Sequence, residues 1–299
     1  MAGTTRFLRQ VCSEMLIAIL GTRGIPASYS GFETCVEETA KRFAASGHQI
    51  RVYCRKGRVG PTAEQHASAK QVFVPFIPGK HTETISHTFF SVLHLIVRRA
   101  DGVQLYGAGN GWFVPMLRLF GFRVVFLTDG LDWERAKWGR LARWLLRNGS
   151  RVGARFAQVC IVDSREVLHK LSASFEAGKF QYVPYGANIT EAATANVLHE
   201  LGLARRDYYL FVGRFVPEKN VELLIQAFNQ ARLTRNLVLV GGNQYDRAYE
   251  LHLRNMANPR VVFPGFVFGE RYLELVSHCY AYVQPSVLEG TSPAILGAI

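Results

Sequence analysis

Short apolar runs alternate with longer amphipathic stretches along the first 186 residues. The runs that we expect to form strands lie at 16–20, 49–54, 71–74, 103–106, 123–127, 158–162 and 180–183. Helical patterns lie between most of them, at 32–46, 85–99, 133–147 and 164–173. Apolar strands that alternate with helices are typical of a parallel sheet covered on both faces. The pattern therefore predicts an α/β domain over 15–186.

The pattern restarts after a polar, Ala-rich stretch at 187–204, which we interpret as an interdomain linker. The second set of expected strands lies at 208–213, 237–240, 261–263 and 281–284, with helices at 218–232, 245–257, 270–278 and 292–299. Four strands are fewer than the five or six of a typical doubly wound nucleotide-binding domain. We therefore expect the second domain, 205–299, to be incomplete. At the other end Met15 opens directly into the first strand, so we expect residues 1–14 to be an N-terminal extension.

The composition of the 299 residues, 48% hydrophobic and 19% charged, excludes a disordered or collagen-like chain. The cysteines number five and form no close pair. An odd, dispersed set disfavours a disulfide framework or a zinc site and indicates a reducing cytosol. No apolar run reaches the roughly 18 residues expected of a membrane-spanning helix.

The net charge of +12 is concentrated in the first part of the chain. Residues 1–195 hold 25 Lys and Arg against 14 Asp and Glu, whereas the remaining residues hold 10 against 9. Such an excess is typical of a protein that meets a nucleic acid, an anionic membrane or a phosphorylated substrate.

Part of this charge lies between 135 and 155, where basic residues recur at near-helical spacing among Trp and Leu. The side chains that we expect at a membrane are Arg140, Arg143, Trp144 and Arg147. Basic and aromatic residues on one helix favour an anionic bilayer surface. A solvated helix face, with the Trp side chains in the core, is the alternative.

A first Gly-rich segment, with Gly24, Ser30 and Gly31, follows the first strand and precedes a helix. Glycine lets the backbone approach a ligand, and a helix N-terminus offers N–H groups to an anion. The spacing is not GxGxxG, which disfavours a nicotinamide oxidoreductase or an epimerase. We interpret a second such segment, 106–112, as a loop that lines a cleft. An ordinary turn between strand and helix is the alternative for the first segment.

A third motif, VGRFVPEKN at 212–220, lies where a strand ends and a helix begins. Arg214 and Lys219 stand five residues apart across this turn, next to Gly213. The Arg fork and the compact Lys charge can converge on one diphosphate. A solvated basic turn is the alternative.

A fourth motif, 284–294, again joins a strand end to a helix start. Thr291 and Ser292 suit a helix N-cap, and Pro293 suits the first turn. Glu289 could accept hydrogen bonds from sugar hydroxyls while the amides of 291–294 face a phosphate. Alternatively, Glu289 is a charge at the helix terminus.

The sequence has no DxD, no His/Cys metal spacing, no GxSxG and no Walker A motif. Metal hydrolases, serine hydrolases and P-loop NTPases are therefore excluded. No RRM, KH, helix-turn-helix or zinc-finger pattern is visible either, which disfavours a nucleic-acid-binding protein.

The segments at 212–220, 237–242, 261–266 and 285–296, in this order, resemble the donor half of family 4 glycosyltransferases with the GT-B fold. GTRGIPASYSGFETCVEE at 21–38, together with 128–144, resembles the N-terminal half of a rhamnosyltransferase-like branch. Enzymes of that branch serve capsule, exopolysaccharide and O-antigen assembly. The resemblance covers roughly 15–299 and implies two Rossmann-like domains that face a cleft.

The resemblance also implies roles for single residues. Arg214 and Lys219 would hold the donor diphosphate, and Glu289 would face the donor sugar. The residues implied around the nucleotide are Gly213, Gly241, Phe266, Thr291 and Ser292. Those implied near the acceptor and the donor phosphate are Gly24, Ser30, Gly31 and Asp129, the last at a place where many members have a His.

The implied activity is retaining, metal-independent transfer of rhamnose or another hexose, without a cofactor, from a nucleotide-diphospho-sugar. The implied acceptor is a polyprenyl-linked saccharide at the cytoplasmic face of the membrane, with no nucleic-acid partner. Gly297 stands where the family has a second Glu, and family members continue beyond the equivalent of residue 299. Two alternatives therefore stay open: an inactive, truncated glycosyltransferase, and a basic membrane- or nucleic-acid-binding protein without catalysis.

Overall fold

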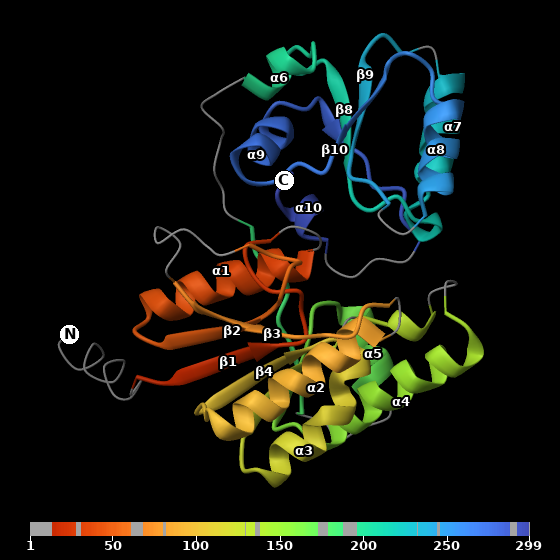
Figure 1. Ribbon diagram of the computed structural model, residues 1–299. Helices are drawn as coiled ribbons and strands as arrows, with labels where there is room; N and C mark the ends of the chain where they lie inside the picture. The colour runs from red at the N-terminus through yellow and green to blue at the C-terminus, as the bar shows by residue number, and fades with distance from the viewer. Residues whose placement is uncertain are drawn as a thin grey trace, which may run out of the picture. The chain divides into compact units, whose positions relative to one another are not determined.

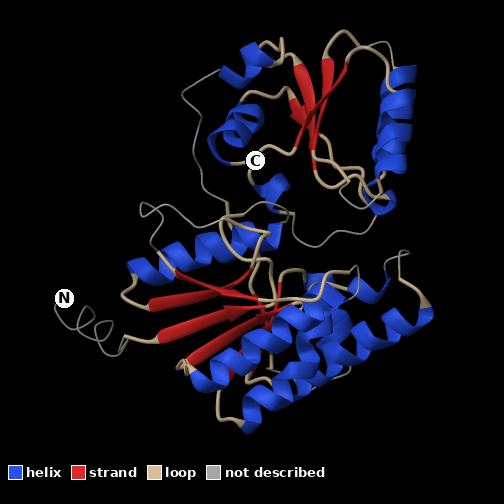
Figure 2. Cartoon of the chain, in the orientation of Figure 1, coloured by secondary structure: helices blue, strands red, loops and turns tan. Residues whose placement is uncertain are grey.

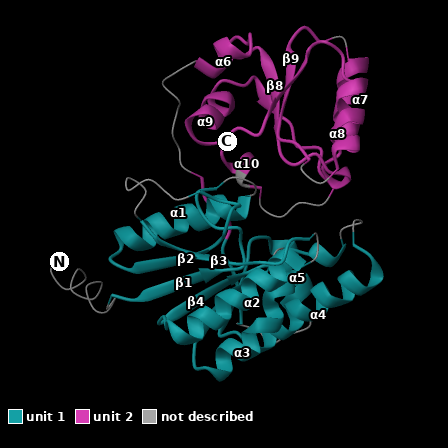
Figure 3. Cartoon of the chain, viewed as in Figure 1, with its two compact units in different colours: residues 1–183 teal, residues 184–299 magenta. Residues whose placement is uncertain are grey.

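A computed structural model describes residues 14–27, 31–60, 68–79, 82–128, 130–134, 138–172, 179–187, 196–231, 233–243, 246–287 and 292–298. The chain divides into two compact units, Met1–Val183 and Pro184–Ile299 (Figure 3). Each unit has a parallel sheet of its own.

The sheet of the first unit has seven parallel strands in the order β3-β2-β1-β4-β5-β6-β7 (Figure 1). The strands are β1 (Leu16–Leu20), β2 (Gln49–Arg55), β3 (Lys70–Val74), β4 (Gly102–Tyr106), β5 (Arg123–Leu127), β6 (Val159–Val162) and β7 (Phe180–Tyr182). Each of the seven strands expected in this part of the chain is present. The α/β class predicted from the alternating pattern is confirmed.

Helices cover both faces of this sheet (Figure 2). They are α1 (Gly31–Ala45), α2 (Thr82–Val97), α3 (Val114–Leu119), α4 (Arg140–Phe156) and α5 (Arg165–Ser172), with the short 3₁₀ helices η3 (Ala108–Phe113) and η4 (Asp132–Glu134). Val36 and Ala40 of α1 pack on the side chains of β1 and β2 that point to one face. Apolar residues of α2–α5 pack on the opposite face. Successive strand residues point to opposite faces, so β1 contributes Ile19 to one core and Leu20 to the other.

The fourth helix differs from the expectation of a helix at 133–147, since α4 begins at Arg140 and continues to Phe156. The extension passes through Gly149 and Gly153, which disfavour a helix when it stands alone. Packing overrides this preference. A Cβ at Gly149 would lie 2.7 Å from the Ala108 carbonyl oxygen, and one at Gly153 would lie 2.5 Å from the Phe126 ring. Two glycines one turn apart thus let α4 approach η3 and the sheet.

The interpretation of 106–112 as a loop is wrong, and its place at a cleft stays a prediction. Most of this segment belongs to η3, which packs against α4. A Cβ at Gly111 would lie 2.0 Å from the Gly149 carbonyl oxygen. The glycines of this segment therefore serve helix packing.

The second unit has four parallel strands in the order β10-β9-β8-β11. The strands are β8 (Tyr208–Val212), β9 (Asn236–Val240), β10 (Val261–Gly265) and β11 (Ala281–Tyr282). Its helices are α6 (Asn196–Glu200), η5 (Pro217–Lys219), α7 (Val221–Gln230), α8 (Arg247–Met256), α9 (Gly269–Ser277) and α10 (Pro293–Leu296). Residues of α7 and α8 pack on one face of the sheet, and residues of α6 and α9 pack on the other (Figure 1).

Two elements of this unit differ from the sequence expectation. The stretch 187–204, expected to be a linker, contains α6, whose Val197 and Leu198 are buried against the sheet. The backbone N–H of Leu198 also donates to Glu274 Oε1 at 3.0 Å, which fixes α6 on α9. The helix expected at 292–299 is the single turn of α10, and Gly297 lies in the turn that follows it.

The strand order reverses at the first strand of each sheet, so β1 lies between β2 and β4, and β8 between β9 and β11. In open parallel sheets, ligands bind beyond the carboxyl ends of the strands at such a reversal. This rule predicts that ligands bind at the loops after β1 and β4 in one unit, and at the loops after β8 and β11 in the other. No helix in the described ranges has both the length and the apolar character that crossing a bilayer requires.

Candidate functional site

The loop after β8 carries Arg214 and Lys219. Gly213 N–H donates to the Val240 carbonyl at 3.0 Å, and Phe215 N–H donates to the Gly242 carbonyl at 3.0 Å. The Phe215 side chain is fully buried and anchors the middle of the loop. Arg214 and Lys219, on either side of this anchor, are half-buried. The β8–α7 loop therefore lies over the ends of β8 and β9 and holds two cationic side chains at the carboxyl edge of the sheet.

Gly241, the residue after β9, fits closely beneath this loop. Its φ is +134°, and a Cβ there would lie 1.8 Å from the Gly213 carbonyl oxygen. Gly241 N–H also donates to the Gly265 carbonyl at 2.8 Å, which ties β9 to the end of β10. Glycine is thus required at 241 both by the backbone conformation and by the approach of Gly213.

Asn220 joins the β8–α7 loop to the segment after β11. Its φ is 51°, a left-handed conformation that Asn tolerates better than most residues. Its Nδ2 donates to the Pro285 carbonyl at 3.0 Å. Val287 N–H donates to the Glu218 carbonyl at 3.0 Å and forms a second link between the same two segments. Asn220 is not among the site residues expected from the sequence, although an Asn directly after Lys219 at a helix start is a usable signal.

Asn243 fixes the opposite side of the loop. Its Nδ2 donates to the Phe215 carbonyl at 2.8 Å, and its backbone N–H donates to Glu250 Oε2 at 2.9 Å. Burial raises the pKa of Glu250, but hydrogen bonds from Asn243 and Arg254 outweigh it, so the pKa is lower than usual. An ionised Glu250 is the better acceptor, so this arrangement keeps Asn243 in place.

Phe266, the residue after β10, presents an aromatic ring at the same edge. It stacks on Phe268 with a centroid distance of 6.3 Å and an interplanar angle of 1°. A Cβ at Gly242 would lie 3.0 Å from the Phe266 ring, so the ring lies over the end of β9. The structure thus brings together Gly213, Arg214, Lys219, Gly241 and Phe266 at the carboxyl edge of one sheet.

Four predicted site residues, Ser30, Asp129, Glu289 and Thr291, lie outside the described residues, and their roles stay predictions. Ser292 is described and is buried directly before α10. Its carbonyl accepts from Leu296 N–H at 3.2 Å.

In the first unit, Gly24 and Gly31 belong to the segment between β1 and α1. Gly24 is buried with φ +112°, and a Cβ there would lie 2.5 Å from Cys54 Sγ. Gly24 therefore lets this loop pack against β2. Gly31 is the exposed first residue of α1.

An ion-pair cluster not expected from the sequence lies at the carboxyl end of β2, with Arg55 and Glu83 buried and Arg58 exposed. Arg55 donates to Glu83 Oε1 at 2.8 Å and to Thr84 Oγ1 at 2.9 Å, and Arg58 donates to Glu83 Oε2 at 2.9 Å. Burial raises the pKa of the Glu83 carboxyl, but the two arginines outweigh it, so the pKa is lower than usual. This cluster fastens the start of α2 to the sheet.

His87, one turn along α2 from this cluster, is fully buried. Burial, and next the Arg55 charge, lower its pKa from 6.5 to about 4, against the opposing effects of the Cys54 carbonyl and Glu83. The unfolded chain takes up this proton as the pH falls through about 6.5, whereas the folded chain takes it up only near 4. The stability that the neutral imidazole contributes is therefore present above pH 6.5 and is lost on acidification.

We expect the free energy of unfolding to fall by roughly 2–3 kcal/mol between pH 7 and pH 4.5 because of His87. Urea unfolding at the two pH values measures the difference, which should shrink by this amount in His87→Leu. His252→Gln, at an exposed histidine, is the control and should keep the full dependence. An equal pH dependence in His87→Leu and the unaltered chain would contradict the assignment.

The exposed face of α4 carries the residues predicted to meet a membrane. Arg140, Arg143, Trp144 and Arg147 are all exposed. The Trp144 ring packs against the Trp112 ring at a tilt of 30° and a centroid distance of 6.1 Å, and Trp112 Nε1–H donates to the Leu145 carbonyl at 3.0 Å. The alternative that placed the Trp side chains in the core is wrong for Trp144.

Two family models match the chain. Residues 30–186 match the glycosyl transferase 4-like domain, and residues 200–299 match glycosyl transferases group 1. The first match alone covers more than half of the chain. The chain belongs to the glycosyl transferase 4-like family.

Solved structures agree with this family at the level of the fold. Sucrose-phosphate synthase from Thermosynechococcus elongatus is 21% identical, with a TM-score of 0.77 over 95% of this chain and 79% of that chain. HepE from Anabaena in complex with UDP-glucose is 18% identical, with a TM-score of 0.74 over 95% and 78%. The lipopolysaccharide outer core galactosyltransferase WaaB is 15% identical, with a TM-score of 0.55 over 95% and 78%. The two parallel-sheet units therefore form a GT-B fold, as predicted. The comparison with curated proteins gives no match.

For this glycosyltransferase, the rhamnosyltransferase-like branch stays a prediction. Within the described part of the chain, no three His, Cys, Asp or Glu side chains are grouped as a metal site would need.

Proposed function

We propose that this glycosyltransferase moves rhamnose or another hexose from a nucleotide-diphospho-sugar to a lipid-linked saccharide in the synthesis of cell-surface polysaccharide. The proposal rests on the carboxyl edge of the second unit, where Arg214 and Lys219 share one loop that hydrogen bonds tie to the ends of β9 and β11. The structurally similar HepE was solved with UDP-glucose, which supports a nucleotide-sugar donor.

In this proposal Arg214 and Lys219 act as the diphosphate leaves. Negative charge grows on the diphosphate as the glycosidic C–O bond breaks, so two fixed cations stabilise the transition state more than the bound donor. Because both cations are side chains, we propose transfer without a metal ion. We assign no side-chain nucleophile, and we propose that the acceptor attacks on the leaving-group face, with retention at the anomeric carbon.

The donor can be identified by thermal shift with dTDP-rhamnose, UDP-hexoses and GDP-mannose. We expect one of them to raise the melting temperature, since a ligand that binds only the folded chain stabilises it. The same donor, radiolabelled, should then label a lipid-linked saccharide extract. A chain that none of these nucleotide sugars stabilises, and that transfers none of them, would contradict the proposal.

We further propose that the first unit docks on an anionic membrane surface at the cytoplasmic face. On α4, Leu141 and Trp144 are 71% and 55% exposed, next to Arg140 and Arg143. An exposed apolar side chain with flanking Arg residues suits the boundary between lipid headgroups and acyl chains. The four described thiols, Cys35, Cys54, Cys160 and Cys279, are free, which supports a reducing compartment.

A second helix also exposes apolar side chains. Four side chains of α2 spaced four residues apart are exposed: Ile85, Phe89, Leu93 and Val97. Phe89 contacts Phe113 of η3 at a centroid distance of 6.4 Å, and Trp112 of η3 contacts Trp144. The neighbouring residues Phe113 and Trp112 of η3 thus contact α2 and α4 respectively, and both helices pack against η3.

Liposome flotation tests the membrane proposal. We expect the chain to float with vesicles that contain anionic lipid and to stay in solution with neutral ones, because each Arg near the surface adds about 1 kcal/mol of attraction. Arg143→Glu with Trp144→Ser should reduce flotation at least tenfold. Arg247→Glu, on the exposed start of α8, is the control for charge alone. Equal flotation with neutral vesicles, or none with either, would argue against docking.

A further inference from the structure

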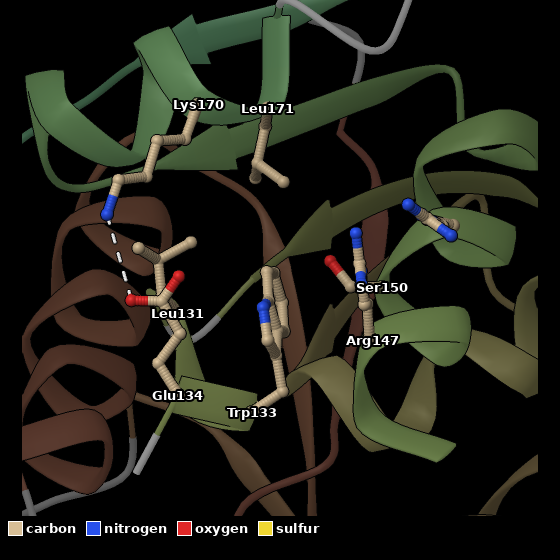
Figure 4. A pocket seen from close by; sticks show the side chains of 8 residues that line it. Leu131, Trp133, Glu134, Arg147, Ser150, Lys170 and Leu171 are labelled. Carbon is tan, nitrogen blue, oxygen red and sulfur yellow. Dashed lines mark ion pairs between the residues drawn. The ribbon is translucent and has the colours of Figure 1, made fainter. Parts of the chain in front are cut away.

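A pocket of about 150 Å³ lies in the first unit among η4, α4 and α5 (Figure 4). Arg147, Ser150 and Arg151 of α4 line one side, and their spacing places them on one face of the helix. Trp133 and Leu131 line another side, and Lys170 of α5 lies across from α4. All of these lining residues belong to the first unit.

The charges of this pocket do not balance. Lys170 Nζ lies 3.7 Å from Glu134 Oε2 and 3.1 Å from Glu166 Oε1, so acidic groups accompany the ammonium. Among the described residues, Arg147 and Arg151 have no ion-pair partner. Among the described residues, the three cations of the lining stand against Glu134 and, beside Lys170, Glu166, which leaves an excess of about one positive charge. An excess of positive charge that includes two guanidinium groups favours a phosphate as the ligand.

Ser150 gives a second, independent indication of a ligand. Its side chain is 1% exposed, and its Oγ has no hydrogen-bond partner among the described residues. A buried hydroxyl without a partner costs free energy unless something else supplies the hydrogen bond. Because Ser150 lines the pocket between the two arginines, an oxygen-rich anion held by them could receive this O–H.

The remaining wall is apolar and flat. In Figure 4 the Trp133 ring stands between the Lys170–Glu134 ion pair and the side chains of Arg147 and Ser150. Leu131 and Leu171 complete this part of the lining. An aromatic ring beside a cluster of donors suits a ligand with an apolar face and an anionic end.

We propose that this pocket binds a sugar phosphate. Its phosphate contacts Arg147, Arg151 and the Ser150 hydroxyl, and its sugar ring lies against Trp133. The site is distinct from the diphosphate loop of the second unit, since no residue is shared. The ligand is either a free sugar phosphate or the glycosyl phosphate of a lipid-linked saccharide. Both present a sugar ring next to an anionic phosphate, although the free monoester carries more negative charge than a phosphate esterified on both sides.

Isothermal titration calorimetry with glucose 1-phosphate tests the pocket. The titration uses the full chain with Lys219→Ala, so that the β8–α7 loop contributes little to the binding that is measured. A failure of the proposed donor site therefore does not change the result for the pocket. We expect saturable binding that Arg147→Gln and Arg151→Gln each weaken at least tenfold, because each removes a charged hydrogen-bond donor. Arg155→Gln, on the same helix but outside the pocket, should bind unchanged. No binding, or equal loss in Arg155→Gln, would overturn the proposal.

Trp133→Ala separates a sugar phosphate from a plain anion. Trp133→Ala should weaken the binding of glucose 1-phosphate several-fold and leave the binding of inorganic phosphate unchanged. The two Arg variants should weaken the binding of both ligands. If Trp133→Ala has no effect on glucose 1-phosphate, the sugar part of the proposal is wrong. A short-chain, water-soluble polyprenyl diphosphate sugar that competes with glucose 1-phosphate would assign the lipid-linked source, and absence of competition would assign the free one.

Discussion

Replacing Arg214 or Lys219 with Ala is expected to slow sugar transfer about 10²–10³-fold each, at saturating donor. Both side chains lie on the β8–α7 loop, and both are proposed to stabilise the charge of the leaving diphosphate. An effect confined to the transition state lowers kcat, whereas lost binding of the donor raises KM. Initial rates with radiolabelled donor over a range of concentrations separate the two.

The matched control for this prediction is Arg205→Ala. Arg205 precedes β8, so it lies at the amino edge of the same sheet, away from the loop. We expect its turnover to stay within about twofold of the unaltered chain, as is usual for an exposed surface change. Near-normal turnover of Arg214→Ala and Lys219→Ala alike would exclude the diphosphate role.

Gly241→Ala is expected to destabilise the second unit by about 3 kcal/mol or more and to abolish donor binding. The added Cβ would lie 1.8 Å from the Gly213 carbonyl oxygen, and the φ of +134° is unfavourable for Ala even without that contact. The neighbour is backbone rather than a flexible side chain, so the β8–α7 loop must move. Urea unfolding and a thermal shift with the identified donor measure the two effects.

Gly202→Ala separates the cost of the positive φ from the cost of the close contact with Gly213. Gly202 also has a positive φ, +65°, but a Cβ there would meet nothing within 4 Å. It should therefore show only the conformational cost, about 1–2 kcal/mol, with donor binding intact. If Gly241→Ala costs no more than Gly202→Ala, the close approach of Gly213 is not the reason for glycine at 241.

The strands could be predicted from the sequence because each is a short apolar run between polar turns, as at 103–106 and 123–127. The helical extension through Gly149 and Gly153 could not, since local preference opposes it. Only the contact with Ala108 and Phe126 makes the small residues favourable there. These two contacts join residues 41 and 27 positions apart in the sequence, so no local pattern predicts them.

In the candidate site, too, local features could be predicted from the sequence and long-range contacts could not. Arg214 and Lys219 could be predicted because a strand end, a Pro and a helix start lie within nine residues. The Asn220–Pro285 hydrogen bond joins segments 65 residues apart, and the Arg55–Glu83 ion pair joins residues 28 apart. The sequence around one residue of each pair does not indicate its distant partner. These contacts could therefore be found only from the three-dimensional structure.

The two hydrogen bonds between the β8–α7 loop and the segment after β11 bear on how donor preference could be exchanged between related enzymes. A graft of 213–220 alone would replace Asn220 and Glu218 while keeping the host's Pro285 and Val287. The grafted loop would then have to form the contacts with Pro285 and Val287 on a segment that comes from a different enzyme. Chimeras should therefore transplant the two segments together, as one recombination block, even though most of the second unit separates them in the gene.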